Sequence, residues 1–331
     1  MDKIGVKIVV IGGGTGSFTL LSNLKYYTNK ITALVNMADD GGSTGQLRDE
    51  LGVLPPGDVR QCLVALSQSE KVRDLFSYRF EEGTLSGHAF GNLFLTALEK
   101  MTGNFAEAVE TASTVLNIVG KVEPVTLDPV TLVMEKSNGE VTRGEFQIGH
   151  ADFGDAVRPE FRLDPEPKMN PAIVPALAEA DLIVIAPGNL YGSLAPALIV
   201  PGVSDAIKNS KAKKVYVCNL VTKPGQTDGF KVHDFAEEIE RLGKFELDYI
   251  LYNTKQPSPE LLDKYAHENE LSVEVDQDKL DTARYKAVGG KFISNEIYKP
   301  AGEHDPIAAA RTLIRHDADA VSRALMKLYF S

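Results

Sequence analysis

The sequence predicts an α/β protein built on a doubly wound parallel sheet with a small antiparallel β insertion. Short apolar runs rich in β-branched residues alternate with helical segments along most of the chain, which is typical of parallel strands buried on both faces. A turn with four glycines follows the first run, and polar clusters follow the later ones. We expect strands at residues 7–11, 31–37, 180–186, 214–218 and 247–252.

The composition is that of a globular protein. The chain has 331 residues, 43% of them hydrophobic and 24% charged, which is enough for a sizeable core. We predict a single domain over residues 1–331 with a β-hairpin insertion at about 120–170. The net charge of −11 disfavours a nucleic-acid partner, because phosphate backbones require a basic surface.

The expected location is cytoplasmic. Cys62 and Cys218 form no CxxC pair, which indicates reduced thiols. No apolar run reaches the roughly 18 residues of a membrane helix, so no membrane partner is expected. The N-terminus reads as a strand and not as a signal peptide.

The turn after the first strand is the strongest motif. It consists of Gly12, Gly13, Gly14, Thr15 and Gly16. Glycine lets the backbone approach an anion, and the following helix offers free N–H groups and a positive dipole end. We expect a phosphate group as the ligand of this turn, although a tight turn with no ligand would use the same residues. Ser17 stands where the dinucleotide fingerprint has its last glycine, and the missing lysine excludes an ordinary Walker A loop.

Two adjacent acids, Asp39 and Asp40, follow the second strand in a glycine-rich turn. An acid at this place can hold the ribose hydroxyls of NAD. Paired carboxylates fit Mg²⁺ equally well, since this ion prefers carboxylates together with substrate phosphates. A solvated acidic turn is the plain alternative.

Two more segments contain candidate site residues. Prolines in 54–60 stop the chain and a helix restarts, with Asp58 expected as its N-cap. Arg60 would lie in the first turn, where a cation opposes the helix dipole, so we expect it to face an anion. His88 and Asn92 are four residues apart near the start of another helix and would project from one face. A structural histidine explains His88 equally well.

In the middle and at the end of the chain, helices and strands are predicted from the spacing of apolar residues and from turn signals. Residues 94–116 form a helical hairpin, and the acidic balance argues against a DNA-reading role for it. Strands at 130–135 and 140–148 flank a Ser-Asn-Gly turn, a strong hairpin signal. We also expect short edge strands at 272–276 and 291–294. A C-terminal helix should run over 305–329 with a break near residue 316.

Three later strands each end in a polar cluster. Because ligands of such sheets bind outside the carboxyl ends of the strands, these clusters should line one crevice. The residues predicted there are Gly188, Asn189, Asn219, Thr222, Lys223 and Asn253.

Taken in order, these motifs resemble one family. The motifs are those at 12–16, 39–45 (DDGGSTG), 54–60 (LPPGD followed by Arg60), 87–93 and 187–191. They are similar to those of the CofD/YvcK-like superfamily, which contains the 2-phospho-L-lactate transferases and the gluconeogenesis factors. The resemblance covers about residues 6–320, and the DDGGSTG and LPPGD segments resemble the gluconeogenesis-factor branch.

The resemblance implies a Rossmann-like cytoplasmic protein that binds a nucleotide diphosphate ligand at the residues named above. The transferase branch moves a phospholactyl-type group from a guanosine diphosphate carrier to a deazaflavin alcohol, with Mg²⁺. The other branch resembles UDP-sugar binders that support cell-wall growth and cell shape on gluconeogenic carbon. We favour non-catalytic regulation over a group transferase, in which Asp39 and Asp40 would hold the metal and be catalytic. An NAD-dependent dehydrogenase comes third.

Other expectations are attached to the same resemblance. A homo-oligomer and cell-wall or metabolic protein partners are compatible with it. The chain departs from the family pattern in one loop, where Lys223 adds a cation and Gln226 removes a carboxylate. These departures concern the identity of the ligand more than the phosphate site.

Overall fold

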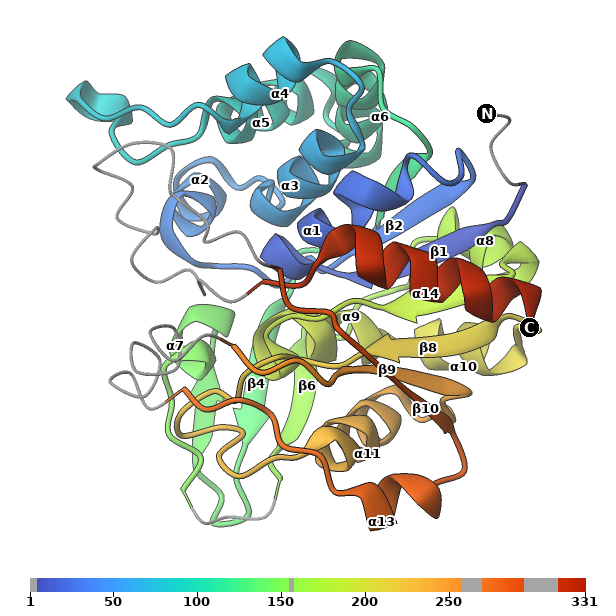
Figure 1. The fold of residues 1–331 in the computed structure, drawn as a ribbon. Helices are drawn as coiled ribbons and strands as arrows, with labels where there is room; N and C mark the ends of the chain where they lie inside the picture. Colours follow the sequence, from blue (N-terminus) through green and yellow to red (C-terminus); the bar gives the residue numbers. More distant parts are fainter. Residues whose placement is uncertain (1–4, 155–157, 258–269, 295–314) are drawn as a thin grey trace.

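The computed structural model describes residues 5–154, 158–257, 270–294 and 315–331 (Figure 1). Its main sheet has seven strands: β1 (Ile8–Gly12), β2 (Ile31–Val35), β3 (Lys121–Pro124), β7 (Leu182–Ile185), β8 (Lys213–Val217), β9 (Tyr249–Asn253) and β10 (Lys286–Gly290). They are parallel, in the order β10-β9-β8-β7-β1-β2-β3. This confirms the predicted fold class.

The strand order reverses at one point. From β1 the chain adds β2 and β3 on one side, and it later adds β7, β8, β9 and β10 on the other. Strands β1 and β7 therefore lie side by side, with Ile8 opposite Leu182. Both strands are buried along their whole length, which explains why their sequences are continuously apolar. Such a reversal is where open α/β sheets bind ligands.

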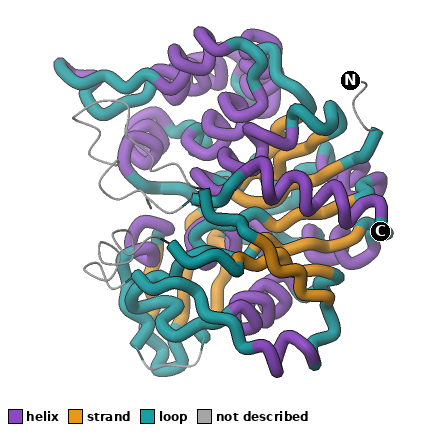
Figure 2. Tube along the Cα trace, in the orientation of Figure 1, coloured by secondary structure: helices purple, strands orange, loops and turns teal. Residues whose placement is uncertain are grey.

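Helices surround the sheet (Figure 2). Since crossovers between parallel strands are right-handed, the helices of the two halves of the sheet cover opposite faces. In the first half, α1 packs against α3 and also against the C-terminal α14. The helices of this half and the last one are α1 (Gly14–Leu24), α2 (Gly42–Leu51), α3 (Gly57–Leu66), α4 (Glu70–Ser77), η1 (Gly83–Leu85), α5 (Phe90–Thr102), α6 (Phe105–Leu116) and α14 (Ala318–Phe330).

The second half of the sheet has its own series of packed helices, in which α10 contacts α8 and α9, and α9 contacts α11. A π-helical turn, η2, follows β7 and leads into α9. The elements are α8 (Ile173–Glu179), η2 (Leu190–Leu194), α9 (Ala195–Leu198), α10 (Val203–Asn209), α11 (Val232–Gly243) and α13 (Gln277–Asp281).

The predicted insertion is a three-stranded antiparallel sheet in the order β5-β4-β6. Its elements are β4 (Thr131–Glu135), β5 (Val141–Arg143), α7 (Glu145–Gly149) and β6 (Glu160–Asp164). The expected strand over 140–148 is wrong in its second half, because the chain leaves the extended conformation at Gly144 (φ 95°) and continues as α7. The range 120–170 also contains β3, which belongs to the main sheet.

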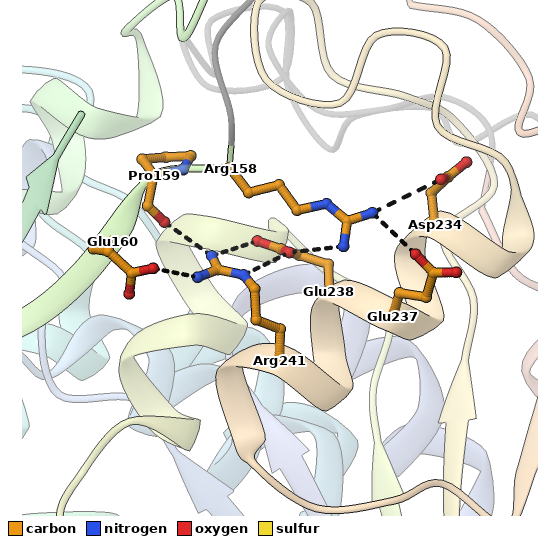
Figure 3. A network of polar contacts seen from close by, with 7 residues as sticks. All are labelled: Arg158, Pro159, Glu160, Asp234, Glu237, Glu238 and Arg241. Carbon is orange, nitrogen blue, oxygen red and sulfur yellow. Dashed lines mark hydrogen bonds and ion pairs between the residues drawn. The ribbon is translucent and has the colours of Figure 1, made fainter. Parts of the chain in front are cut away.

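A buried charge network fastens this insertion to α11 (Figure 3). The Glu238 side chain is fully buried. It accepts hydrogen bonds from Nε and Nη2 of Arg241, at 2.9 and 2.8 Å. Nη1 of Arg158 lies 3.4 Å from Glu238 Oε2, and Arg241 also donates to the carbonyl of Pro159 beside β6. The Tyr191 hydroxyl, from η2, forms a further hydrogen bond with Glu238.

Three local predictions need correction. Residues 272–276 and 291–294 form only isolated bridges, while the last strand is β10, whose Lys-Ala-Val-Gly-Gly sequence is a weak strand signal. Asp58 is not an N-cap, because α3 starts one residue earlier and Pro56 holds the cap position. The last part of the predicted C-terminal helix is α14, which begins after its N-cap Asp317, and residues 305–314 lie outside the described part of the chain.

Candidate functional site

The loops after β1 and β7 meet at the reversal point of the sheet. A Cβ built on Gly16 would lie only 1.6 Å from the Pro187 carbonyl oxygen, so the start of α1 packs directly on the second loop. Gly13 is the N-cap of α1, and Gly14 adopts a φ of 59°, which glycine tolerates best. The glycines of this turn thus serve close backbone packing at the switch point.

Asp58 covers the start of α1. A Cβ on Gly13 would lie 2.0 Å from Asp58 Oδ2, and the Gly14 N–H donates a hydrogen bond to the same carboxylate. Burial raises the pKa of Asp58 well above its usual value, and the charges of Asp39 and Glu145 raise it further. The carboxylate therefore occupies the positive end of the helix, where an anion is stabilised.

Asp39 and Asp40 point to different partners. Asp39 accepts the Gly41 N–H at 3.0 Å, and burial raises the pKa of its carboxyl. Asp40 accepts the N–H groups of Glu145 and Phe146 at 3.1 and 2.7 Å, and so caps α7 from the main domain. Of these two acids, it is Asp39 whose charge raises the pKa of Asp58.

The sequence interpretation missed Glu145, which the insertion carries into this group. Burial raises the pKa of Glu145 to about 7, and the charges of Asp39 and Asp40 add to the effect while Lys223 opposes it. Its Oε1 lies 2.2 Å from the position of a Cβ on Gly192, in η2. The signal that could have found it is Gly144, which interrupts the strand alternation directly before an acid.

The loops after β7 and β8 contribute polar groups. Asn219 holds Gly188 from both sides, accepting its N–H at 3.4 Å and donating to its carbonyl at 2.8 Å. The Asn189 Oδ1 accepts the Gly192 N–H at 3.2 Å and caps η2. Burial lowers the pKa of Lys223, while Glu145 and Glu270 raise it.

Arg60, His88 and Asn92 form a separate group at α2. Arg60 is buried and its Nε donates to Asn92 Oδ1 at 2.8 Å. The Ser43 hydroxyl contacts His88 Nδ1 at 2.8 Å and accepts from Asn92 Nδ2 at 3.4 Å. His88 precedes α5 and Asn92 lies inside it, so the two converge on Ser43 and not along one helix face. Arg60 also reaches Asp58 electrostatically, which links the groups.

Thr222 and Asn253 make local bonds instead. The Thr222 hydroxyl accepts the Leu271 N–H at 3.1 Å. Asn253 Oδ1 accepts the N–H groups of Lys255 and Phe292, both at 3.1 Å. Gln226 donates to the carbonyls of Ile148 and Ala151, and so holds the C-terminal end of α7.

The carboxylates fit a magnesium ion in part. In the described ranges, no three His, Cys, Asp or Glu side chains are grouped as metal ligands. Mg²⁺ commonly takes only one or two protein carboxylates together with substrate phosphates. Asp58 is buried and the charge of Asp39 raises its pKa, so these two acids lie within electrostatic reach of each other. The two oxygens of Asp40 already accept backbone N–H groups.

In the part of the chain that the structure describes, no single helix is long and apolar enough to cross a membrane. One bent pair, Leu190–Leu198 and Val203–Asn209, meets the length and composition criteria when its two helices are taken together.

Comparison with known proteins identifies the family of this chain. Residues 8–293 match the family described as 2-phospho-L-lactate transferase CofD. The gluconeogenesis factor of Bacillus subtilis is 39% identical over 325 residues, which cover 97% of this chain and 98% of that protein. The gluconeogenesis factor of Halalkalibacterium halodurans is 42% identical, with 97% and 95% covered.

A solved structure supports the same family assignment. The crystal structure of a UPF0052 family member from Bacillus halodurans has a TM-score of 0.88 and 39% sequence identity, and the match covers 98% of this chain and 100% of that one. Sequence, fold and motif order therefore lead to the same conclusion: the chain belongs to the CofD family and is similar over nearly its whole length to the gluconeogenesis factors.

Proposed function

We propose that the protein binds a nucleoside diphosphate-sugar, of the UDP-sugar type, and acts as a regulator of carbon metabolism, cell-wall growth and cell shape. The observation that carries the proposal is the reversal point between β1 and β7, where the Gly12–Gly16 turn meets the Pro187–Ser193 loop. Ligands of open α/β sheets bind at such a point. The names of the similar gluconeogenesis factors support the regulatory part.

The charges at this point support a ligand with a cation. Burial disfavours the ionised forms of Asp39, Asp58 and Glu145, and these ionised forms would also repel an added diphosphate, so a bound cation would offset both effects. Asp39 and Asp58 would hold Mg²⁺, which neutralises phosphate charge when it is bound. Asn189 would bind the ligand beside them, and Lys223 would add a positive charge.

Calorimetry tests the binding. We expect UDP-N-acetylglucosamine or GDP, with Mg²⁺, to bind more tightly than NAD. The variant Gly14→Val should lose this binding, since a β-branched residue is strained at a φ of 59° and would distort the turn. Circular dichroism shows whether that variant is folded. Preferred binding of NAD, or equal binding by the folded variant, would contradict the proposal.

An active Mg²⁺-dependent group transferase is the second candidate. The nearness of Asp39 and Asp58, shown by the effect of the Asp39 charge on the Asp58 pKa, favours it, because a catalyst must neutralise charge that develops on a transferred phosphorus-linked group. A mass-spectrometric screen with cell extract as the acceptor source separates the two. A regulator gives no product. If the wild type forms a Mg²⁺-dependent product and the Asp39→Asn/Asp58→Asn variant does not, the protein is a catalyst and the regulatory proposal is wrong.

A further inference from the structure

The Gly192 backbone lies beneath two side chains of complementary character. A Cβ on this glycine would lie 2.2 Å from Glu145 Oε1 and 2.8 Å from Asn189 Nδ2. The first atom accepts hydrogen bonds and the second donates them. They come from different parts of the chain, Glu145 from the insertion and Asn189 from the loop after β7.

Both groups keep unused hydrogen-bonding capacity. Among the described residues, none donates to the Glu145 carboxylate, whose interactions with Asp39, Asp40 and Lys223 are purely electrostatic. Asn189 uses only its Oδ1, as the acceptor that caps η2. An acceptor and a donor of this kind, placed next to each other, match a hydroxyl group, which both donates and accepts.

The position of Glu145 is built by several contacts. Its own N–H and that of Phe146 bind Asp40, so the first turn of α7 is fixed to the main domain. A Cβ on Gly144 would lie 2.6 Å from Asp40 Oδ2, so this contact requires glycine. Gln226 holds the other end of α7. A side chain supported at both ends of its short helix is pre-organised for recognition.

We propose that Glu145 and Asn189 together recognise a hydroxyl of the sugar in the nucleoside diphosphate-sugar, so that the insertion selects the sugar. A phosphate at this place could bind Asn189 but would be repelled by Glu145 and by the charges of Asp39 and Asp40. The neutral, hydroxyl-rich half of the ligand therefore fits here. This inference rests on the proposed function.

The test compares each sugar nucleotide with its sugar-free diphosphate. Calorimetry is run with UDP-N-acetylglucosamine against UDP, and with GDP-mannose against GDP. Glu145→Gln keeps the shape but removes the charge, and Asn189→Ser keeps an oxygen that can cap η2, removes the amide donor and adds no charge. Each variant should weaken binding of the sugar nucleotide ~5- to 50-fold, as expected when a hydrogen bond to a charged or amide group is lost. The affinity for the sugar-free diphosphate should change less than about threefold.

The control is Glu135→Gln, an exposed glutamate on β4 of the same insertion, which should leave both affinities unchanged. The double variant Glu145→Gln/Asn189→Ser should be non-additive for the sugar nucleotide and additive for the diphosphate. Equal losses for both ligand types would overturn the inference and indicate an effect on phosphate or metal. Unchanged affinities would overturn it as well. A wild-type protein that binds no sugar nucleotide would refute the proposed function itself.

Discussion

Charge is unevenly distributed among the residues near the meeting point of the loops after β1 and β7. Asp39, Asp58 and Glu145 have raised pKa values, which means that their ionised forms are poorly compensated. Lys223 is the cation that lowers the pKa of Glu145, and burial lowers its own pKa. A ligand or metal that supplies positive charge would therefore relieve repulsion already present in the folded protein.

Lys223 offers the first prediction. If it contacts the anionic part of the ligand, Lys223→Gln should weaken nucleotide binding about five- to hundredfold, since a partly shielded ion pair contributes ~1–3 kcal/mol. Calorimetry at low salt measures this, with the exposed Lys211→Gln as the control. An unchanged dissociation constant would mean that Lys223 only balances Glu145 and Glu270.

The pH dependence of stability gives the second prediction. The pKa of Glu145 rises from 4.5 to about 7 on folding, so its contribution is favourable below pH 4.5 and is lost as the pH rises to about 7. Glu145→Gln should therefore be more stable than the wild type at pH 8, by about 3 kcal/mol, and this difference should vanish near pH 4.5. Urea unfolding over this pH range measures it. A pH-independent difference would contradict the assignment.

At the level of elements, α7 depends on one distant residue. Asp40 caps this five-residue helix from a position 105 residues earlier in the chain. Asp40→Ala should cost about 1–2 kcal/mol of stability, as for other lost caps. It should also speed hydrogen exchange at the amides of Glu145 and Phe146. Asp49→Ala, on the exposed side of α2, is the control. Unaltered exchange in the first variant would show that α7 needs no cap.

The same dependence explains what the sequence could predict. The strands β1, β2, β7, β8 and β9 were predictable because burial on both faces requires continuous apolar runs. The helix α7 was not, since its five residues carry no helical period and its cap is supplied by tertiary structure. Strand β10 was missed because two of its five residues are glycine.

The candidate site divides in a similar way. The placement of strand-end residues such as Gly188 and Asn189 could be predicted because parallel strands end at one edge of the sheet, and their role as site residues stays a prediction. Glu145 was missed because no local rule says where an insertion will dock. The expected cap role of Asp58 was wrong because its side chain is drawn to the N–H of Gly14, in a segment more than 40 residues away.

For the whole molecule, the Glu238 network joins the insertion to α11 of the main domain. Glu238→Gln should reduce stability by about 3–5 kcal/mol, because it leaves Arg241 and Arg158 without their buried counter-charge. Glu237→Gln is the matched control, since this exposed neighbour contacts only Arg158 and should cost less than about 1 kcal/mol. Equal losses for the two variants, measured by denaturant unfolding, would argue against the network.

The reversal of strand order also determines how the chain can fold during synthesis. Strand β1 meets β2 almost at once, but its other edge pairs with β7, and the flanking Lys7 and Asp181 are 174 residues apart. Translation proceeds at roughly 5–20 residues per second, so the edge of β1 that pairs with β7 stays unpaired for about 10–35 seconds. The apolar strand that later forms the centre of the molecule is for this interval an unpaired edge, open to pairing with other chains. Newly made protein is therefore most prone to aggregation before β7 has emerged from the ribosome.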